Sequence, residues 1–380
     1  MDWMVGTDQL DAIQRRTVET VVRSSHKNHL IKGFAGTGKT IVVTHVLKRL
    51  ASRRDLRVCF ATYTFALKEM VESGLTIRER SSITSTTFDG FSQVHDDFDV
   101  IVADEMQDID ERRLKILLAR SKKLICSADH MQTIYRKSLP ESGFRALLSP
   151  LQTYELRTIH RLNRPVFDVA TSIIERHCNT RPKYGKLPLD DREPVRVAKT
   201  ASRRQESSMV VDEAERLSRI RYPSAILVPS HSQISHLLND ISRLRSWGPI
   251  PPETGDRYNP YAKTNEFLLR KGSVIEIFGS KSGKLESSAH RRVVYLMTYH
   301  SAKGLEFQNV FLPYLKDGNL TSPIVGATAK ELAETFFVAA TRAKERLYLS
   351  YHGSNPHIYI KTVLALPPSK VRPLALRKWS

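Results

Sequence analysis

The stretch GFAGTGKT, residues 33–40, has glycines, a lysine and a threonine at the spacing of a phosphate-binding loop. Glycines let backbone N–H groups turn inward around phosphate oxygens. The lysine is expected to reach the β and γ phosphates, and the threonine hydroxyl to bind Mg²⁺. An apolar run, HLIKGF, precedes the loop as a strand would, and IVVTHVLKRL follows with helical spacing. The phosphates would then lie at a helix N-terminus. The alternative is a Gly-rich turn with a chance lysine. The nucleotide-binding residues expected here are Gly33, Gly36, Thr37, Gly38, Lys39 and Thr40.

A pair of adjacent carboxylates follows the apolar run VIVA. We expect Asp104 to hold Mg²⁺ through water, and Glu105 to orient and deprotonate an attacking water. The alternative is a pair of solvated acids at a strand end. The buried-strand pattern and the upstream loop favour the hydrolytic site.

Length and composition restrict the class of protein. A chain of 380 residues predicts two or three domains with sizeable cores. It contains no run of about 18 apolar residues, so we expect no membrane span. The acidic, polar N-terminus lacks the features of a signal peptide. Cys59, Cys126 and Cys178 lie far apart without metal-like spacing, which favours a reducing, cytoplasmic location.

The charge of the chain is strongly positive and unevenly distributed. The net charge is +19, yet residues 1–148 hold 23 basic and 19 acidic residues, and the remainder holds 36 basic and 21 acidic residues. Such an excess indicates a polyanionic partner. A basic surface that only aids solubility is the alternative. Together with the phosphate loop, the charge favours nucleic acid, without separating DNA from RNA.

Short apolar runs alternate with helical patterns along most of the chain. This alternation predicts α/β domains with parallel sheets, and two sheets are expected because one continuous core would be too large. We place the domains at 1–149 and 150–380. A Pro/Gly/Tyr-rich segment at about 245–290 is expected to be an insertion or long hairpin instead of sheet core. The predicted strands lie within 56–62, 99–105, 123–129, 224–230, 291–300, 309–315 and 346–352.

The segment VADEMQD resembles motif II of superfamily 1 helicases of the UvrD/Rep/PcrA type. Further stretches resemble the other motifs of this family in the family's order. Motifs V and VI are the most diagnostic of them. The matching stretches are TDQLDAIQ for the Q motif, ATYTFALKEM for motif Ia, TTFDGF for motif Ib, SADHMQTIY for motif III, LRTIHRLNRPV for motif IV, TYHSAKGLEF for motif V and VAATRAKERLYL for motif VI.

The resemblance implies two RecA-like domains with ATP and Mg²⁺ bound between them. Arg161 and Arg342 would grip the γ-phosphate, and an arginine supplied by another element is worth several orders of magnitude in rate. Gln132 would sense the γ-phosphate. The remaining nucleotide contacts implied are Gln9 to adenine, His160 stacked on adenine, Glu306 at the ribose, and Gly304 in the same motif V.

The resemblance also implies a single-stranded DNA track, with RNA as the other candidate. Binding of single strands combines basic grooves with aromatic stacking. For two of the implied contacts a structural role is an equal alternative, since Tyr63 could belong to the core and Thr87 could cap a helix. The full set of implied nucleic-acid contacts is Tyr63, Thr87, Tyr135, Lys137, Thr298 and His300.

The spacing of the motifs predicts a compact form of this family. Only 64 positions separate Thr40 from Asp104, and 137 separate Arg161 from Thr298. Larger relatives insert the accessory domains 1B and 2B in these two gaps, so most of both is expected to be missing here. We expect an ATP-dependent 3′–5′ translocase or helicase. The alternative is a nucleic-acid-gated ATPase subunit that regulates a partner such as a nuclease in an antiphage system. A binding module with a decayed ATPase is disfavoured because the hydrolytic residues are intact.

Overall fold

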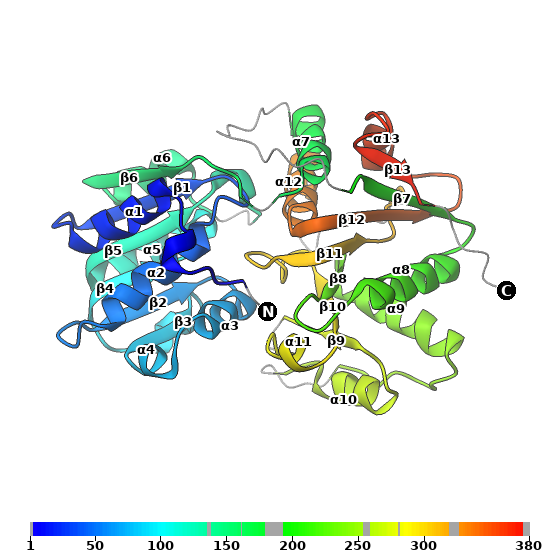
Figure 1. Cartoon of the computed structure of the whole chain (residues 1–380), viewed down its shortest axis with the longest axis horizontal. Coiled ribbons are helices and arrows are strands. Elements are labelled where there is room, and N and C mark those ends of the chain that lie inside the picture. Colours follow the sequence, from blue (N-terminus) through cyan, green and yellow to red (C-terminus); the bar gives the residue numbers. More distant parts are fainter. Residues whose placement is uncertain are drawn as a thin grey trace. The chain divides into compact units, whose positions relative to one another are not determined.

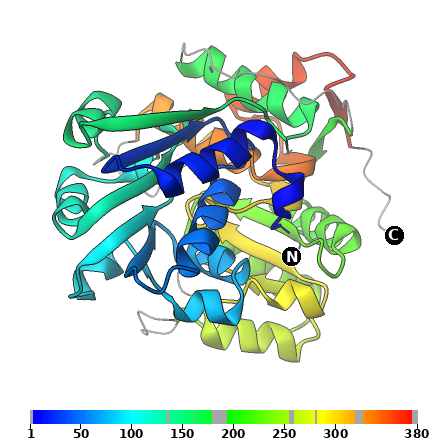
Figure 2. The same ribbon diagram turned by 60° about the vertical axis from the view of Figure 1, so that its left-hand side comes forward.

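The computed structural model describes residues 3–134, 138–160, 162–178, 193–253, 259–279, 282–318 and 327–374. The chain divides into two compact units, a first unit that ends at His160 and a second unit formed by the described residues from 162 onward. Each unit is an α/β layer structure around one sheet (Figures 1 and 2). Among the described helices, none has both the length and the apolar character that a membrane crossing needs.

The first unit is built on a six-stranded sheet in the order β3-β2-β4-β5-β1-β6, with every pair parallel. All five residues of β2 are buried, as expected for a strand covered on both faces. The edge strand β6 has one buried residue of six and is correspondingly polar. The strands are β1 (Asn28–Gly33), β2 (Val58–Thr62), β3 (Ile83–Thr87), β4 (Phe98–Ala103), β5 (Ser121–Ala128) and β6 (Leu151–Leu156).

Helices cover both faces of this sheet. Leu114 of α5 and Phe144 of α6 pack with Cys59 and Ile101 in one core layer. Side chains alternate along a strand, so α2, which contacts four of the strands, covers the opposite face together with α1. The helices are α1 (Ala12–Arg23), α2 (Lys39–Ala51), α3 (Phe65–Ser73), α4 (Ile77–Ser81), α5 (Glu111–Ala119) and α6 (Glu141–Leu147), with short 3₁₀ turns η1 (Thr7–Gln9), η2 (Gly90–Gln93), η3 (Met106–Asp108) and η4 (His130–Gln132).

The second unit is built on a seven-stranded sheet in the order β13-β7-β12-β11-β8-β10-β9, again with every pair parallel. The central strands β8 and β10 are buried along their whole length. The strands are β7 (Val195–Thr200), β8 (Ser224–Val228), β9 (Ile275–Ile277), β10 (Val294–Thr298), β11 (Phe307–Leu312), β12 (Ala343–His352) and β13 (Val371–Pro373).

Two groups of helices cover this second sheet. Figure 1 shows α7, α12 and α13 on one face and α8, α9 and α10 on the other. Apolar residues of α8 and α9 form one core cluster with Ile226, Leu296 and Phe311 of the strands. The helices are α7 (Arg164–Cys178), α8 (Arg203–Leu217), α9 (His231–Leu244), α10 (Ala262–Arg270), α11 (Ser287–His290), α12 (Ala329–Ala340) and α13 (Ile358–Leu364).

The predicted class, an α/β fold of two RecA-like units, is confirmed, and each of the seven predicted runs overlaps a strand. The division between the units differs from the expected one at 149/150. Residues 151–156 form β6, which pairs with β1, and the first unit continues to His160. The segment at 245–290 also differs from expectation, because its residues 275–277 form an edge strand of the second sheet.

Candidate active site

A glycine-dependent loop joins β1 to α2. Gly36 and Gly38 have φ angles of 77° and 84°, a left-handed conformation that favours glycine. A Cβ at Gly33 would lie 2.4 Å from Thr37 Oγ1, so this position also needs glycine. The first N–H groups of α2 have no acceptor within the helix. The loop therefore directs backbone donors to one point, as a phosphate cradle requires.

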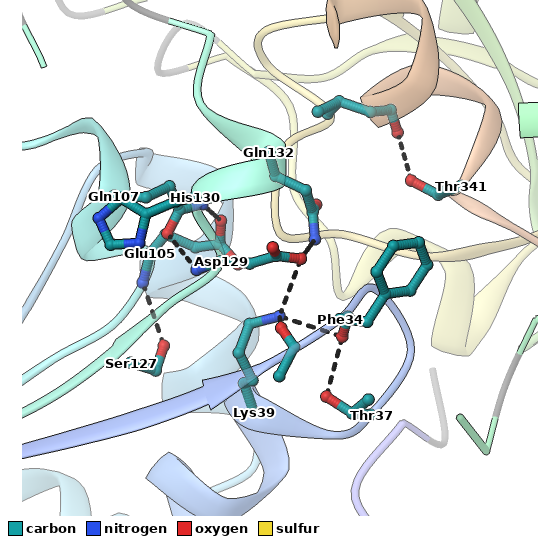
Figure 3. A network of polar contacts seen from close by, with 12 residues as sticks. Phe34, Thr37, Lys39, Glu105, Gln107, Ser127, Asp129, His130, Gln132 and Thr341 are labelled. Carbon is teal, nitrogen blue, oxygen red and sulfur yellow. Dashed lines mark hydrogen bonds and ion pairs between the residues drawn. The ribbon is translucent and has the colours of Figure 1, made fainter. Parts of the chain in front are cut away.

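The loop lysine is buried and bonded to its own loop. Lys39 Nζ donates to Gly33 O at 2.8 Å and to Phe34 O at 3.3 Å, and it lies 3.7 Å from Asp129 Oδ2 (Figure 3). Both partners of this ion pair have side chains only 6% exposed. The ammonium group is thus held at the mouth of the loop by oxygen atoms that phosphate oxygens could replace.

The carboxylate at the end of β4 has the character of a cation ligand. Asp104 is fully buried, and Ser127 Oγ donates to its Oδ1. Burial and the charge of Glu105 raise the pKa of Asp104 to about 6, and hydrogen bonds from Ser127 and Thr40 lower it in part. Its Oδ2 atom is buried without a hydrogen-bond partner among the described residues. A buried carboxylate oxygen beside the Thr40 hydroxyl fits the oxygen ligands that Mg²⁺ takes.

The next residue, Glu105, is held in an uncommon backbone conformation. Its φ and ψ are 60° and 40°, in the left-handed region that non-glycine residues rarely adopt. The Glu105 N–H donates to Asp104 Oδ1 at 3.1 Å, and Gln107 Nε2 donates to Glu105 Oε2 at 2.6 Å. Such strain is typical of functional sites and costs on the order of 1–3 kcal/mol. The surrounding bonds therefore fix one orientation of this carboxylate.

A continuous polar chain connects the loop lysine to this glutamate. Gln107 Oε1 accepts from the Asp129 N–H at 3.1 Å, and Gln132 Nε2 donates to Asp129 Oδ2 at 2.7 Å (Figure 3). Lys39, Asp129, Gln107 and Glu105 are thus linked in sequence. The sequence analysis assigns no role to Gln107, Asp129 or Ser127, although all three lie within the quoted motifs II and III.

Gln9 is the glutamine predicted to contact adenine, but a different glutamine contacts the phosphate loop. Gln9 is exposed, and its Oε1 accepts from the Gly6 N–H at 3.0 Å. Gln14 is instead buried, and its Nε2 donates to Thr37 O at 3.0 Å. A Cβ at Gly38 would lie 2.5 Å from that Nε2 atom. The structure therefore places Gln14, five residues further along, against the phosphate loop.

His160 also lies at this loop. Its backbone N–H donates to Gly36 O at 2.9 Å, and its Nε2 lies 2.8 Å from Asp11 Oδ2. Asp11 also caps α1 by accepting from the Gln14 N–H. The imidazole is 35% exposed, so one part of the ring remains available to a ligand beside Gln14.

In the second unit, motifs V and VI supply the other predicted residues. Gly304 has a φ of 80°, and Glu306 is half-buried just before β11. The Arg342 side chain is buried, with Nε donating to Val338 O at 2.8 Å, Nη2 to Thr341 Oγ1 at 3.0 Å and Nη1 to Leu305 O at 3.2 Å. These bonds hold the guanidinium at the start of β12.

Comparison with known proteins decides the family. A model of the UvrD-like helicase C-terminal domain matches residues 261–354, and an AAA domain model matches residues 9–181. DNA helicase II of Escherichia coli strain K12 is 30% identical over 117 residues, which cover 30% of this chain and 16% of that protein. The UvrD1 helicase of Mycobacterium leprae is 48% identical over 61 residues, which cover 15% of this chain and 8% of that protein. The chain belongs to the UvrD-like superfamily 1 helicases.

Solved helicase structures are also similar to this UvrD-like chain. The crystal structure of arterivirus nonstructural protein 10, a helicase, matches with a TM-score of 0.41 and 15% identity, covering 88% of this chain and 61% of that one. The curated relatives are matched over no more than 16% of their length. These partial matches do not by themselves assign an activity, a substrate or a partner to the whole chain.

Three residues that the UvrD-like motifs assign to nucleic acid make local contacts. Tyr63 is half-buried, with its ring edge-on to Phe88 at 5.8 Å. The Thr87 hydroxyl accepts from the Gly90 N–H at 3.1 Å, where η2 begins. The Thr298 hydroxyl accepts from the Ser301 N–H, also at 3.1 Å. These contacts give each residue a structural role in addition to the predicted one.

His300 follows Thr298 at the carboxyl end of β10. Burial is the main cause that lowers the pKa of His300 to about 4, and electrostatic interaction with His231 is a smaller one. The imidazole is therefore neutral at physiological pH and can take part in hydrogen bonds, but it cannot form an ion pair with phosphate. The predicted residues Tyr135, Lys137 and Arg161 lie outside the described residues.

The Pro/Gly/Tyr-rich segment packs against the motif V turn. Tyr261 OH lies 2.6 Å from His231 Nδ1 and donates to Glu253 Oε1 at 2.6 Å. Gly279 has a φ of 102°, and a Cβ there would lie 2.6 Å from Ser301 Cβ. This close approach needs glycine, and it ties the segment to the turn that follows β10.

Proposed function

We propose that this chain couples ATP hydrolysis to movement on single-stranded nucleic acid. The observation that carries the proposal is the polar chain from Lys39 through Asp129 and Gln107 to Glu105. It joins a phosphate loop to an oriented carboxylate, which is the arrangement that hydrolysis of a nucleoside triphosphate needs. Membership of the UvrD-like helicases supports the coupling of that hydrolysis to nucleic acid.

The cofactors proposed are ATP and Mg²⁺. Thr40 and Asp104 would hold the ion, since the Asp104 Oδ2 atom has no other partner among the described residues. Bound Mg²⁺ supplies charge neutralisation on the phosphates. Glu105, fixed by Gln107, would orient a water molecule and accept its proton at Oε1 or Oε2. Lys39 would exchange its bonds to the loop carbonyls for bonds to phosphate oxygens.

The other nucleotide contacts are proposed from the motifs. Gln14 and His160 are the proposed adenine contacts because both are bonded to the phosphate loop. Arg342 and Arg161 would stabilise charge on the γ-phosphate in the transition state, with Gln132 as its sensor. Glu306 stays the proposed ribose contact, and Gly304 stays a proposed nucleotide-binding residue.

The proposed track is single-stranded DNA with 3′–5′ movement, and RNA is the other candidate. The polarity rests on the family resemblance. The aromatic and polar groups needed for such a track are proposed from the same motifs. They are Tyr63, Thr87, Tyr135, Lys137, Thr298 and His300.

A second candidate function is a nucleic-acid-gated ATPase subunit of a larger assembly, with a nuclease as one class of partner. The observation that favours it is the lack of an accessory domain between Thr40 and Asp104. Every element described there, from α2 to β4, belongs to the first unit. A chain that lacks these additions is less suited to unwind duplexes alone, and a partner would then use the nucleotide cycle.

The test is steady-state ATP hydrolysis without nucleic acid and with single-stranded DNA, single-stranded RNA or blunt duplex, across a salt series. Strong stimulation by single-stranded DNA that weakens with salt is expected for the motor. Stimulation by RNA alone would reassign the track. A high rate that no nucleic acid changes would contradict coupling to a track and favour the gated subunit.

A further inference from the structure

An exposed basic turn lies at the amino edge of the second sheet, between α8 and β8. Arg219 and Tyr222 exchange two backbone hydrogen bonds, both of 3.0 Å. Arg221 has a φ of 67°, a strained conformation for a residue with a side chain. All four side chains of the turn are exposed, including Ile220 at 51% and Tyr222 at 53%. A strained turn that presents two arginines and an uncovered tyrosine to solvent has no role in the core.

A third arginine lies beside this turn. The Arg221 N–H donates to Ser288 O of α11 at 2.7 Å, which ties the turn to the segment that leads into β10. Strands β8 and β10 are parallel, with Val294 opposite Ser224. Arg292 precedes Val294 by two residues, as Tyr222 precedes Ser224, so the two lie side by side. Arg292 is exposed. We name the group of Arg219, Arg221, Tyr222 and Arg292 the amino-edge patch.

The positive charge of the amino-edge patch is not neutralised by the carboxylates around it. Neither Arg219 nor Arg221 has an ion-pair partner among the described residues, and the Arg292 guanidinium donates to a backbone carbonyl, that of Glu215. Glu286 is the remaining exposed acid close to the turn. The other nearby carboxylates pair with different arginines, as Glu276 with Arg291, Glu215 with Arg245 and Glu213 with Arg216.

We infer that the amino-edge patch is a further contact surface for a single-stranded nucleic acid. Guanidinium groups bind phosphate oxygens through paired hydrogen bonds. Tyr222 would stack on an unpaired base, which a duplex does not offer. The patch is separate from Thr298 and His300, because these lie at the carboxyl end of β10. It also gives a role to part of the positive charge that the motifs leave unexplained. The inference rests on the proposed function, since both take nucleic acid as the partner.

The test compares the double variant Arg219→Gln/Arg221→Asn with a matched control. Asparagine tolerates the left-handed backbone at position 221. The control Arg204→Gln/Arg243→Gln removes the same charge from exposed positions of α8 and α9. Binding of a labelled oligothymidylate is measured by fluorescence anisotropy across a salt series, and thermal unfolding verifies that each variant folds.

Loss of two phosphate contacts should lower the slope of log K against log salt by about 1.4, which makes binding about 25-fold weaker at about 0.1 M salt. The control should keep most of the wild-type slope. Tyr222→Ala should weaken binding by about fivefold or more while leaving the slope unchanged. A patch variant that equals its control in affinity and slope would overturn the inference.

Two further outcomes separate this inference from the proposed function. If the wild-type chain binds no oligonucleotide at any salt concentration, the proposed track fails and the inference fails with it. If the wild-type chain binds the oligonucleotide, and the patch variants match the control variant in affinity and in salt slope, the inference is refuted. The proposed function is not affected by that outcome. Displacement of the oligonucleotide by polyglutamate at equal charge would assign the patch to acidic polypeptides and overturn it.

Discussion

Replacing Gln107 by glutamate tests whether this side chain orients the proposed catalytic carboxylate. Gln107 is 1% exposed, and its amide donates to Glu105 Oε2 while its oxygen accepts from the Asp129 N–H. A glutamate keeps the size and the bond to Asp129. It replaces the donor with a second carboxylate oxygen beside Glu105. The substitution therefore changes one bond of the network and leaves the other in place.

The short distance between the side chains at positions 105 and 107 determines the protonation state of the two carboxyl groups in Gln107→Glu. Two carboxylate charges 2.6 Å apart repel by about 6 kcal/mol at an effective dielectric constant of about 20. Keeping a proton on a glutamate at neutral pH costs only about 4 kcal/mol, given an ordinary pKa of about 4.3. The repulsion exceeds the cost of keeping the proton, so the pair in Gln107→Glu retains one proton. Glu105 then shares that proton and loses its capacity as a base.

Hydrolysis should fall by about 100-fold or more at neutral pH, the contribution typical of a general base. The rate should recover in part as the pH rises and the pair loses its proton.

The same pair also makes the stability of the fold depend on pH. A carboxyl group whose pKa is raised in the folded state stabilises the fold fully at pH values below its pKa in the unfolded chain, and this stabilisation is lost as the pH rises. The variant should therefore unfold at a lower temperature relative to wild type at alkaline pH than at acidic pH. The control is Gln93→Glu, which adds the same charge at an exposed site. An unchanged kcat with an unchanged pH profile would refute the role of Gln107.

Four further predictions concern the residues proposed to act on ATP. Lys39→Ala should abolish hydrolysis and leave nucleic-acid binding mostly intact, and equal ATPase rates would contradict the assignment. Arg342→Ala should lower kcat far more than ATP affinity, because the role proposed for Arg342 is confined to the transition state, and an unchanged kcat would exclude that role. Since burial raises the pKa of Asp104 to about 6, its charge at neutral pH costs stability without metal. Asp104→Asn should thus raise the unfolding temperature at about pH 7.5 while removing Mg²⁺-dependent hydrolysis, and a lower unfolding temperature would refute this interpretation. Gln14→Ala should raise the KM for ATP more than Gln9→Ala does, and the opposite order would restore Gln9 as the adenine contact.

The strands predicted from the sequence are those buried on both faces. Residues 99–105 and 224–230 are apolar runs because helices cover their strands from both sides. The strands that the sequence did not reveal are mostly edge strands, such as β3 with ITSTT and β6 with LQTYEL. An edge strand is partly solvated, so its sequence carries polar residues and no continuous apolar run. For the same reason the sequence predicts a domain boundary where the structure has β6, an edge strand of the first sheet.

The phosphate loop could be predicted because its chemistry is local. Glycines at 33 and 38, with lysine next to the second, define a loop by spacing alone. The partners of Lys39 could not be predicted in this way. Asp129 is 90 positions away in sequence, and it meets the lysine only because β1 and β5 are neighbours in the sheet. Contacts made by strand pairing depend on topology, which the motifs do not encode.

The two glutamines of the first segment show a limit of assigning residues by motif position. Gln9 and Gln14 both lie in the stretch TDQLDAIQ that resembles the Q motif. The structure separates them by secondary structure. Gln9 ends the exposed turn η1, whereas Gln14 lies in the first turn of α1, where Asp11 caps the helix and fixes its direction. The cap turns the Gln14 amide toward Thr37 O, so a helix start determines which side chain meets the loop.

For Glu105, the sequence predicts the proposed chemical role but not the backbone conformation. Its place after a buried strand and an aspartate indicates a catalytic carboxylate, yet nothing in its residue type predicts a left-handed backbone. The conformation arises from its surroundings, because the Glu105 N–H is drawn to Asp104 Oδ1 and the side chain is held by Gln107. An ordinary extended residue there would continue β4 and carry the carboxylate away from the lysine. If the bonds from Gln107 and Asp104 maintain this strain, Glu105→Gly should stabilise the fold by relieving it while removing hydrolysis. A lower unfolding temperature for that variant would show that the glutamate side chain contributes more to the fold than its backbone conformation costs.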